Sequence, residues 1–458
     1  MKRLLSAIVR RADIMIVVTL LITAVMSFFA LKIKLDPDYY CIFPENNKRS
    51  AELLENTGIT ETLDMMMILS VSADDALSVK KLGLLYDVIK ELEQHPLVAQ
   101  CTTPFNFITF NNVNGRLSIE KMADSPPSNE EELAEFKKRL LNEPLAQDII
   151  VSDDGTTLNV LITNTAIEEP AKYMEDFDKI ISPLKGEFEI AYTGDIPFSD
   201  HTINYLKRDL LVLVLLAAVV ILIVLYLSFR ALRAVFLPFL TVAIGAIWAV
   251  GFSALIGYKL TVVSVVLPII ILAIGSSYTV HILSEYFRSY DGGDKVEGIC
   301  LAVLHVIKTV MLAGLTTIIG FCSLLFTSIR PLREFGLTVS FGILSCVILT
   351  IFFLPAMLSK FSPPRKEQKE KINNDFITKI VVIIGRFVGK WYPILFILFF
   401  IIIILAIVLF PHIDRKVNYI AYFPSKDKLV KDTYEIISDS GGYQSINITL
   451  QAPDGAEG

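Results

Sequence analysis

The side chains best able to carry chemistry lie in Leu260–Arg288, a stretch with no Asp, Glu, Lys or Arg before Glu285. The uncharged part is long enough to cross the ~30 Å hydrocarbon core as a helix. It contains Ser277, Tyr278 and His281, and the i, i+4 spacing places Ser277 and His281 on one helix face. A titratable ring at membrane depth usually faces a bundle interior or a wet cavity. The pattern therefore indicates either a proton or ion relay through these three residues or a polar patch that holds helices together.

Two glycines in apolar stretches suggest how neighbouring helices approach. Gly275 lies in the stretch just described and Gly314 in a later apolar run. Small residues let helix backbones come close together in lipid, where helix association depends on packing. We expect both glycines to lie at helix contacts.

Composition defines the class of protein. Hydrophobic residues make up 53% of the 458 residues and the mean hydropathy is +0.56, which is too apolar for an ordinary soluble domain. The net charge of −6 gives no reason to expect nucleic acid. The five cysteines and five histidines show no metal-ligand spacing, so we expect no metal site and no cofactor. No nucleophile–base set is present, so an enzyme is not expected. Cys41 and Cys101 lie in a polar domain, and whether they pair is left open.

Seven uncharged runs each meet the length criterion for a spanning helix. They are Ile14–Leu31, Leu210–Phe229, Ala234–Tyr258, Leu260–Ser284, Thr309–Ile329, Phe335–Ser359 and Ile394–Phe410. They divide the chain into 1–33 (basic tail and first span), 34–207 (polar domain), 208–359 (second to sixth spans), 360–390 (charged linker), 391–413 (seventh span) and 414–458 (start of a second polar domain). Within the linker, Phe376–Val388 is amphipathic enough to lie along a membrane face.

The polar domain 34–207 has alternating strand and helix patterns. Its short apolar runs predict strands at Met65–Val71, Val98–Thr102, Asp148–Val151, Leu158–Thr163 and Phe188–Tyr192. Helical periodicity occurs at Ala76–Gln94, Asn129–Asn142 and Glu169–Ile181, and Asp153-Asp154-Gly155 predicts a hairpin turn. The order predicts an α+β domain built from ferredoxin-like βαβ units.

The loop charges predict the orientation in the membrane. With the N-terminus in the cytoplasm, the short loops on that side carry 17 Lys and Arg, against three (Lys259, Arg330 and Arg333) on the other side. The positive-inside rule therefore places the polar domain 34–207 outside the cytoplasm and the linker 360–390 inside.

A short motif occurs twice, each time directly after a span. After the first span the chain reads LDPDYYCIFPENN from Leu35, and after the seventh it reads IDRKVNYIAYFPSKD from Ile413. Transporters are often built from repeated halves. We therefore expect a repeat of span, domain and five spans whose second copy is truncated. The missing C-terminal half, with a second outer domain and further helices, would be a partner of this one.

These features together resemble the resistance-nodulation-division (RND) superfamily, specifically its MMPL-like, hydrophobe/amphiphile efflux branch. The resemblance is strongest over Leu312–Leu358, which includes the Pro-Leu-Arg-Glu-Phe-Gly turn at Pro331–Gly336 and the Leu-Pro-Ala ending at Leu354–Ala356. Thr193–Pro197 resembles the family's entry into the second span. The block Leu210–Ser359 is similar in layout to the sterol-sensing domain of Patched and its relatives.

The fourth span departs from the family pattern at one position. In the family that the chain resembles, export members typically have a Gly-x-Asp-Tyr motif followed closely by His. The Asp of this motif is thought to carry the coupling proton. Here Ser277 stands at the Asp position and His281 is retained. A hydroxyl does not release a proton near neutral pH. Three alternatives remain: His281 takes the proton, the missing half supplies a carboxylate, or this half is uncoupled.

The resemblance implies a multi-pass transporter of the cell membrane that exports lipids or other hydrophobic or amphiphilic molecules, driven by an ion (proton) gradient. The alternative is a sterol-sensing-domain-like receptor or scaffold that binds lipid without pumping. The expected partners are the cargo, membrane lipids and the second half of the chain, with a homo-oligomer as a further possibility. The identity of the cargo is left open.

Overall fold

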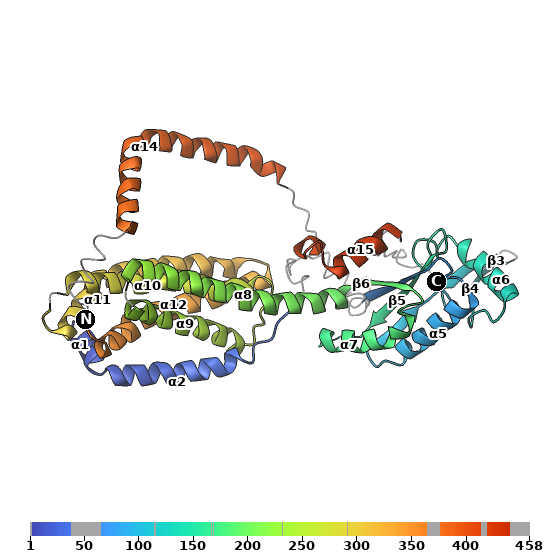
Figure 1. Ribbon diagram of the computed structural model, residues 1–458, viewed down its shortest axis with the longest axis horizontal. Coiled ribbons are helices and arrows are strands. Elements are labelled where there is room, and N and C mark those ends of the chain that lie inside the picture. The colour runs from blue at the N-terminus through green and yellow to red at the C-terminus, as the bar shows by residue number, and fades with distance from the viewer. Residues whose placement is uncertain are drawn as a thin grey trace, which may run out of the picture. The chain divides into compact units, whose positions relative to one another are not determined.

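The protein forms two compact units. The computed structural model describes residues 2–37, 66–113, 116–165, 167, 169–230, 232–290, 292–363, 376–413 and 419–439. Residues 1–45 and 205–416 make up the helical unit, and residues 46–204 and 417–458 make up the α+β unit. Each unit is described separately below (Figure 1).

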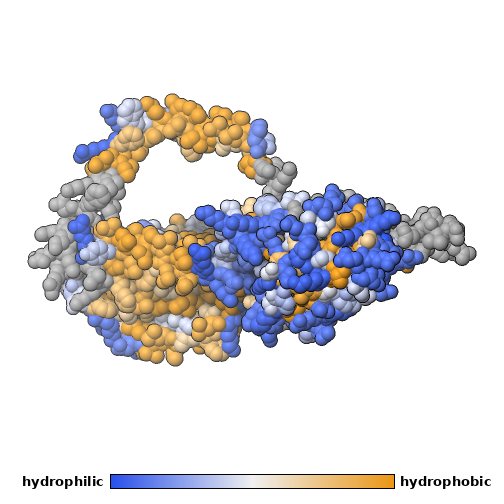
Figure 2. All heavy atoms as spheres, turned by 45° about the vertical axis from the view of Figure 1, so that its right-hand side comes forward, coloured by the Kyte–Doolittle hydropathy of each residue, from blue (hydrophilic) through white to orange (hydrophobic). Residues whose placement is uncertain are grey.

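The helical unit supplies all seven expected spans. Within the described residues, seven helices are long and apolar enough to cross a membrane. They are α2 (Ala12–Ala30), α8 (Asp195–Phe229), α9 (Leu232–Leu255), α10 (Leu267–Ser289), α11 (Lys295–Cys322), α12 (Arg330–Lys360) and α14 (Phe376–Leu409). Apolar side chains cover most of the visible surface of this unit, whereas polar side chains dominate on the α+β unit (Figure 2). The chain is therefore a polytopic membrane protein.

Three helices form the centre of the helical unit. In the apolar windows of α12, α9 and α10, 72%, 61% and 50% of the residues are buried, against 11% or less in the other spans. Their shared core contains Leu272, Val339 and Leu354. The outer helices expose Leu, Ile and Val side chains, as expected where the neighbour is lipid rather than protein.

The first span packs on the outside of this centre. Trp248 of α9 donates a 2.9 Å hydrogen bond from Nε1 to Thr23 Oγ1 of α2. Gly251, one turn along α9, lies against the backbone carbonyl of Met26. Because a side chain at position 251 would meet backbone atoms, this glycine sets the close approach of α2 to α9.

The basic N-terminal tail is helical. α1 (Lys2–Arg10) buries Leu5 and Val9 in the core of the helical unit. Lys2 at its start pairs with Glu297 of α11 at 2.9 Å. The basic residues therefore lie on an amphipathic helix whose apolar face packs in the core of the helical unit. A count of charges alone does not predict this packing.

Three helices extend well beyond the predicted spans. α8 begins at Asp195 rather than Leu210. α11 begins at Lys295 rather than Thr309, because Asp294 caps it by accepting a hydrogen bond from the Val296 N–H at 3.1 Å. α14 is one bent helix in which the predicted amphipathic segment Phe376–Val388 runs directly into the seventh span (Figure 1). Pro393 lies inside α14, and proline is the residue that most often kinks a helix.

The α+β unit contains a four-stranded antiparallel sheet with the order β2-β5-β1-β6. Its elements are β1 (Met66–Ser72), α5 (Val79–Glu93), β2 (Val98–Thr102), β5 (Thr157–Asn164), α7 (Pro170–Ile180) and β6 (Glu189–Gly194). Leu69 at the middle of β1 faces Val160 of β5 and Tyr192 of β6. Two βαβ units, β1-α5-β2 and β5-α7-β6, are therefore interleaved in one sheet.

An insertion separates the two βαβ units. It contains the hairpin β3 (Ile108–Val113) and β4 (Arg116–Lys121), which the sequence analysis did not predict, followed by α6 (Glu130–Leu141). The predicted strand Asp148–Val151 is wrong. Asp148 has a φ of 63°, and only Val151 pairs, with Gln147 and Leu158. Ile150 and Val151 are apolar because they fill the core of the α+β unit.

The segment that follows α14 packs on this sheet. α15 (Lys428–Asp439) lies against β6, where Thr433 and Thr193 share a buried 2.7 Å hydrogen bond. Ile436 packs with Ile68 and Ala191 on the face of the sheet opposite α5 and α7. Residues 419–439, which the sequence analysis assigned to the start of a second polar domain, thus lie on the first one.

Candidate functional site

Helix α10 presents two distinct faces. Ile271, Gly275, Tyr278 and Ile282 are buried against neighbouring helices. Ala273, Ser277, His281 and Ser284 are exposed. Ser277 and His281 thus lie together on the outer face of α10, as their spacing predicts. Tyr278 lies on the buried face, so the structure does not bring all three predicted relay residues together.

The outer face is polar at the depth of the membrane. Ser277 donates its hydroxyl hydrogen to the Ile274 carbonyl at 2.7 Å, which leaves only the oxygen lone pairs for a second partner. His281 lies close to the middle of α10 and has no hydrogen-bond or ion-pair partner within the described residues. An imidazole ring facing hydrocarbon would be costly, so this face is suited to contact with protein or water.

Tyr278 belongs to the contact between α10 and α11. The tyrosine is 2% exposed. Its hydroxyl oxygen lies 3.9 Å from the position that a Cβ on Gly314 would take. Thr317, one turn further along α11, is the hydroxyl-bearing neighbour of Tyr278. The Tyr278 hydroxyl has no hydrogen-bond partner among the described residues, and the Thr317 hydroxyl donates to the Ala313 carbonyl at 2.7 Å.

Gly275 and Gly314, the two glycines expected at helix contacts, lie at crowded helix crossings. A Cβ on Gly275 would come within 2.8 Å of Cys346 Sγ and of Val242 Cγ1. A Cβ on Gly314 would come within 2.6 Å of Val347 Cγ2. Both distances are shorter than side-chain carbons tolerate, so each crossing depends on the absence of a side chain.

A charged cluster that the sequence analysis missed joins α10 to α11. Glu285 Oε1 lies 2.9 Å from His305 Nδ1, and Glu285 Oε2 lies 2.6 Å from Arg288 Nη2. Glu285 lies one residue beyond the predicted span Leu260–Ser284, so that span does not include it. The signal that could have revealed it is its position four residues after His281, within a helical period of the same span.

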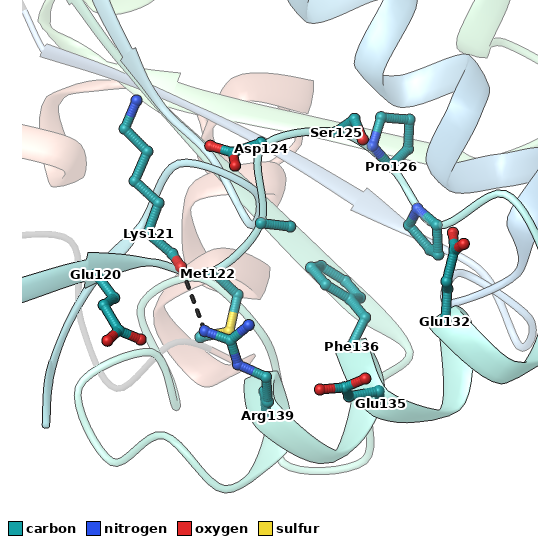
Figure 3. A pocket seen from close by; sticks show the side chains of 12 residues that line it. Glu120, Lys121, Met122, Asp124, Ser125, Pro126, Glu132, Glu135, Phe136 and Arg139 are labelled. Atoms are coloured by element: carbon teal, nitrogen blue, oxygen red, sulfur yellow. Dashed lines mark hydrogen bonds between the residues drawn. The ribbon is translucent and has the colours of Figure 1, made fainter. Parts of the chain in front are cut away.

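The α+β unit contains an open pocket of about 500 Å³ between β4 and α6. Met122 and Phe136 are buried at its base, and Glu120, Asp124, Glu135 and Arg139 surround it (Figure 3). Arg139 donates a 3.3 Å hydrogen bond to the Lys121 carbonyl. The mixture of charges suits a polar group better than a hydrocarbon chain.

The described residues contain no group of three or more His, Cys, Asp or Glu that could hold a metal ion. Cys101 is a free, buried thiol, and burial raises its pKa to about 12. A thiol with so high a pKa is a poor nucleophile at neutral pH. Cys41, its predicted potential partner, lies outside the described residues.

Comparison with known proteins gives one family and several distant relatives. The model of the MMPL family matches residues 47–408. A membrane protein of Methanocaldococcus jannaschii is 23% identical over 360 residues, covering 75% of this chain and 89% of that protein. The membrane protein YdfJ of Bacillus subtilis is 28% identical over 256 residues, covering 52% of this chain and 33% of that protein. The hopanoid transporter HpnN of Burkholderia multivorans is 20% identical over 203 residues, covering 44% of this chain and 22% of that protein.

The chain therefore matches most of the archaeal relative but a third or less of the two bacterial ones. The family match extends from the α+β unit through all the spans from α8 to α12 and most of α14. It includes the polar fourth span and the glycine crossings. Because the match covers well over half of the sequence, the chain belongs to the MMPL family of the RND superfamily.

Proposed function

We propose that this protein exports a lipid or another hydrophobic or amphiphilic molecule across the cell membrane, driven by a proton gradient. Membership of the MMPL family supports an RND-type transporter. A relative named as a hopanoid transporter, although only 20% identical, supports a lipid-like cargo. The seven spanning helices provide the membrane-embedded body that such a transporter requires.

The α+β unit is proposed to be a ferredoxin-like porter domain outside the cytoplasm. The order β2-β5-β1-β6 with two interleaved βαβ units supports this assignment. The excess of 17 to three Lys and Arg in the loops supports the orientation. The pocket between β4 and α6 would then accept the polar headgroup of a cargo molecule.

One observation carries the proposal of coupling. His281 is exposed on the outer face of α10, near the middle of a span, beside the hydroxyl of Ser277. An imidazole ordinarily titrates near neutral pH and so can take up and release the transported proton. Because lipid is a poor neighbour for this ring, we propose that a second repeat or a second copy of the chain covers this face.

The alternative function is a lipid-binding receptor or scaffold that does not pump. It is favoured by Ser277, which stands where export members carry an Asp. A serine cannot replace a carboxylate as a proton carrier. In this alternative, the outer face of α10 would bind lipid or another helix without titrating.

Reconstitution separates the two functions. The full-length protein is placed in liposomes with a fluorescent phospholipid or a hopanoid as the probe, and movement of the probe between leaflets is followed. A pump moves the probe only while a pH gradient exists, and a protonophore stops it. If the probe binds to the protein but its movement is the same with and without a gradient, the non-pumping alternative holds. Protein-free liposomes give the background rate.

A further inference from the structure

We propose that Glu285 and His305 form a proton-binding pair at the end of the helical unit that faces the cytoplasm. In this role, the pair exchanges protons between the cytoplasmic water and the fourth span. The inference rests on the proposed function for its orientation and for the proton as the coupling ion. It names a site other than Ser277, Tyr278 and His281.

The geometry joins two helices through one carboxylate. Glu285 is on α10 and His305 is on α11, and these helices pack side by side. The carboxylate holds His305 Nδ1 at 2.9 Å and Arg288 Nη2 at 2.6 Å through its two separate oxygens. Both oxygens of Glu285 therefore have a partner, and the imidazole is the partner that can gain or lose a proton.

The two side chains differ in their access to water. The side chain of Glu285 is 8% exposed, whereas that of His305 is 59% exposed. His305 precedes the uncharged run Thr309–Ile329, so its exposed ring lies at the end of the span, where water is within reach, whereas Glu285 lies inside the bundle. Among the described residues of the helical unit, Glu285 is the one charged side chain that is buried. A buried carboxylate in a span is rarely retained without a function.

The pair is also placed next to the polar face of the fourth span. His281 precedes Glu285 by one helical turn on α10, so that the two side chains are neighbours on the helix surface. From the middle of α10 toward its C-terminal end, His281 is followed by Glu285, and Glu285 contacts His305 of α11. Each is able to accept a proton.

The helices packed around the pair carry several charged groups, including Lys2, Arg3 and Arg10 of α1, which packs against α11 and α12. Arg288 is on the same helix, and Lys308 is one turn beyond His305 on α11. On α12, Lys360 is already paired with Asp13 at 2.6 Å. From Ala234 onward, α9 has no charged side chain. Within this set, Glu285, Arg288 and His305 are the groups that contact one another directly.

The pair can be tested in the chain itself by NMR titration of the histidines in nanodiscs. The His305 signal is assigned by its loss in His305→Gln. If the carboxylate binds the imidazole, Glu285→Gln changes the pH dependence of the His305 signal, because the carboxylate beside the ring is lost. Glu297→Gln, which removes a carboxylate paired with Lys2, is the control and leaves the midpoint unchanged. An unchanged midpoint in Glu285→Gln would overturn the inference.

A second measurement separates a proton site from a structural ion pair. The rate of gradient-driven transport by the full-length protein is measured from pH 5.5 to 8. If the pair carries protons, Glu285→Gln and His305→Gln change the shape of the pH profile at matched protein levels. If wild type transports and both variants keep its profile, the pair is only structural and the inference fails. If wild type itself ignores the gradient, the proposed function fails, while the NMR titration still decides whether the pair binds a proton.

Discussion

Ser277 and Tyr278 are adjacent in sequence but face different surroundings on α10. Ser277 is exposed on the outer face, whereas the hydroxyl of Tyr278 is buried 3.9 Å from the position of a Cβ on Gly314. A relay that passes directly from one hydroxyl to the other is therefore not assembled. Ser277 shares the outer face with His281, whereas Tyr278 packs against α11.

The crossing of α11 and α12 should not tolerate a side chain at Gly314. Gly314→Leu forces a branched chain against Val347, and such overpacking ordinarily costs about 1–3 kcal/mol. Gly320→Leu is the matched control, because a Cβ at this position on the same helix meets nothing within 4 Å. Thermal unfolding in detergent should show a lower melting temperature for Gly314→Leu only. Equal melting temperatures would remove Gly314 from the packing account.

The orientation of the chain can be tested by labelling intact cells. In a cysteine-free background, Ser128→Cys lies in the α+β unit and Gly293→Cys lies in the connection between α10 and α11, both at exposed positions. A membrane-impermeant maleimide should label Ser128→Cys, and it should label Gly293→Cys only after the membrane is opened. The reverse pattern would invert the proposed topology.

The attachment of α15 to β6 should depend on pH through Asp432. Burial raises the pKa of this carboxyl, and Lys428 and the Tyr192 backbone N–H oppose the rise. Asp432 therefore binds a proton more tightly when α15 is attached to β6 than when it is detached. Protonation of Asp432 stabilises the attached state fully at low pH, and this stabilisation is lost as the pH rises through the raised pKa.

Asp432→Asn removes the buried ionisable group. Hydrogen exchange, corrected for intrinsic rates, should show stronger protection of the α15 amides at high pH, and the gain should shrink at low pH, where Asp432 is protonated. Glu435→Gln makes the same change of charge on the exposed side of α15 and should have little effect. A gain that is equal at both pH values would show that burial of the charge is not the cause.

Periodicity and length were sufficient to predict the spans and most of the α+β unit. Val98–Thr102 forms β2 as predicted, and the predicted strand Leu158–Thr163 differs from β5 by one residue at each end. The prediction of a strand at Asp148–Val151 was wrong, because apolar residues in a turn can fill a core as well as those in a strand. The β3–β4 hairpin was missed because ITFNNV and RLSIEK mix polar and apolar residues without a continuous apolar run.

The site was only partly predictable from the sequence. Helical spacing correctly grouped Ser277 with His281, because both depend on the period of a single helix. The burial of Tyr278 and the pairing of Glu285 with His305 depend on how α10 meets α11. Contacts between helices arise from tertiary packing, which one helix period does not encode.

The most direct test of the central claim is the transport rate of His281 variants. Full-length wild type, His281→Ala, Ser277→Ala and Ser277→Asp are reconstituted at matched amounts, and gradient-driven movement of the lipid probe is measured. If His281 carries the coupling proton, His281→Ala loses about a hundredfold or more of the gradient-dependent rate, and Ser277→Ala loses less. A gain in Ser277→Asp would show that the scaffold still accepts a carboxylate at this position. If His281→Ala responds to the pH gradient like wild type, the proposed coupling through α10 is contradicted.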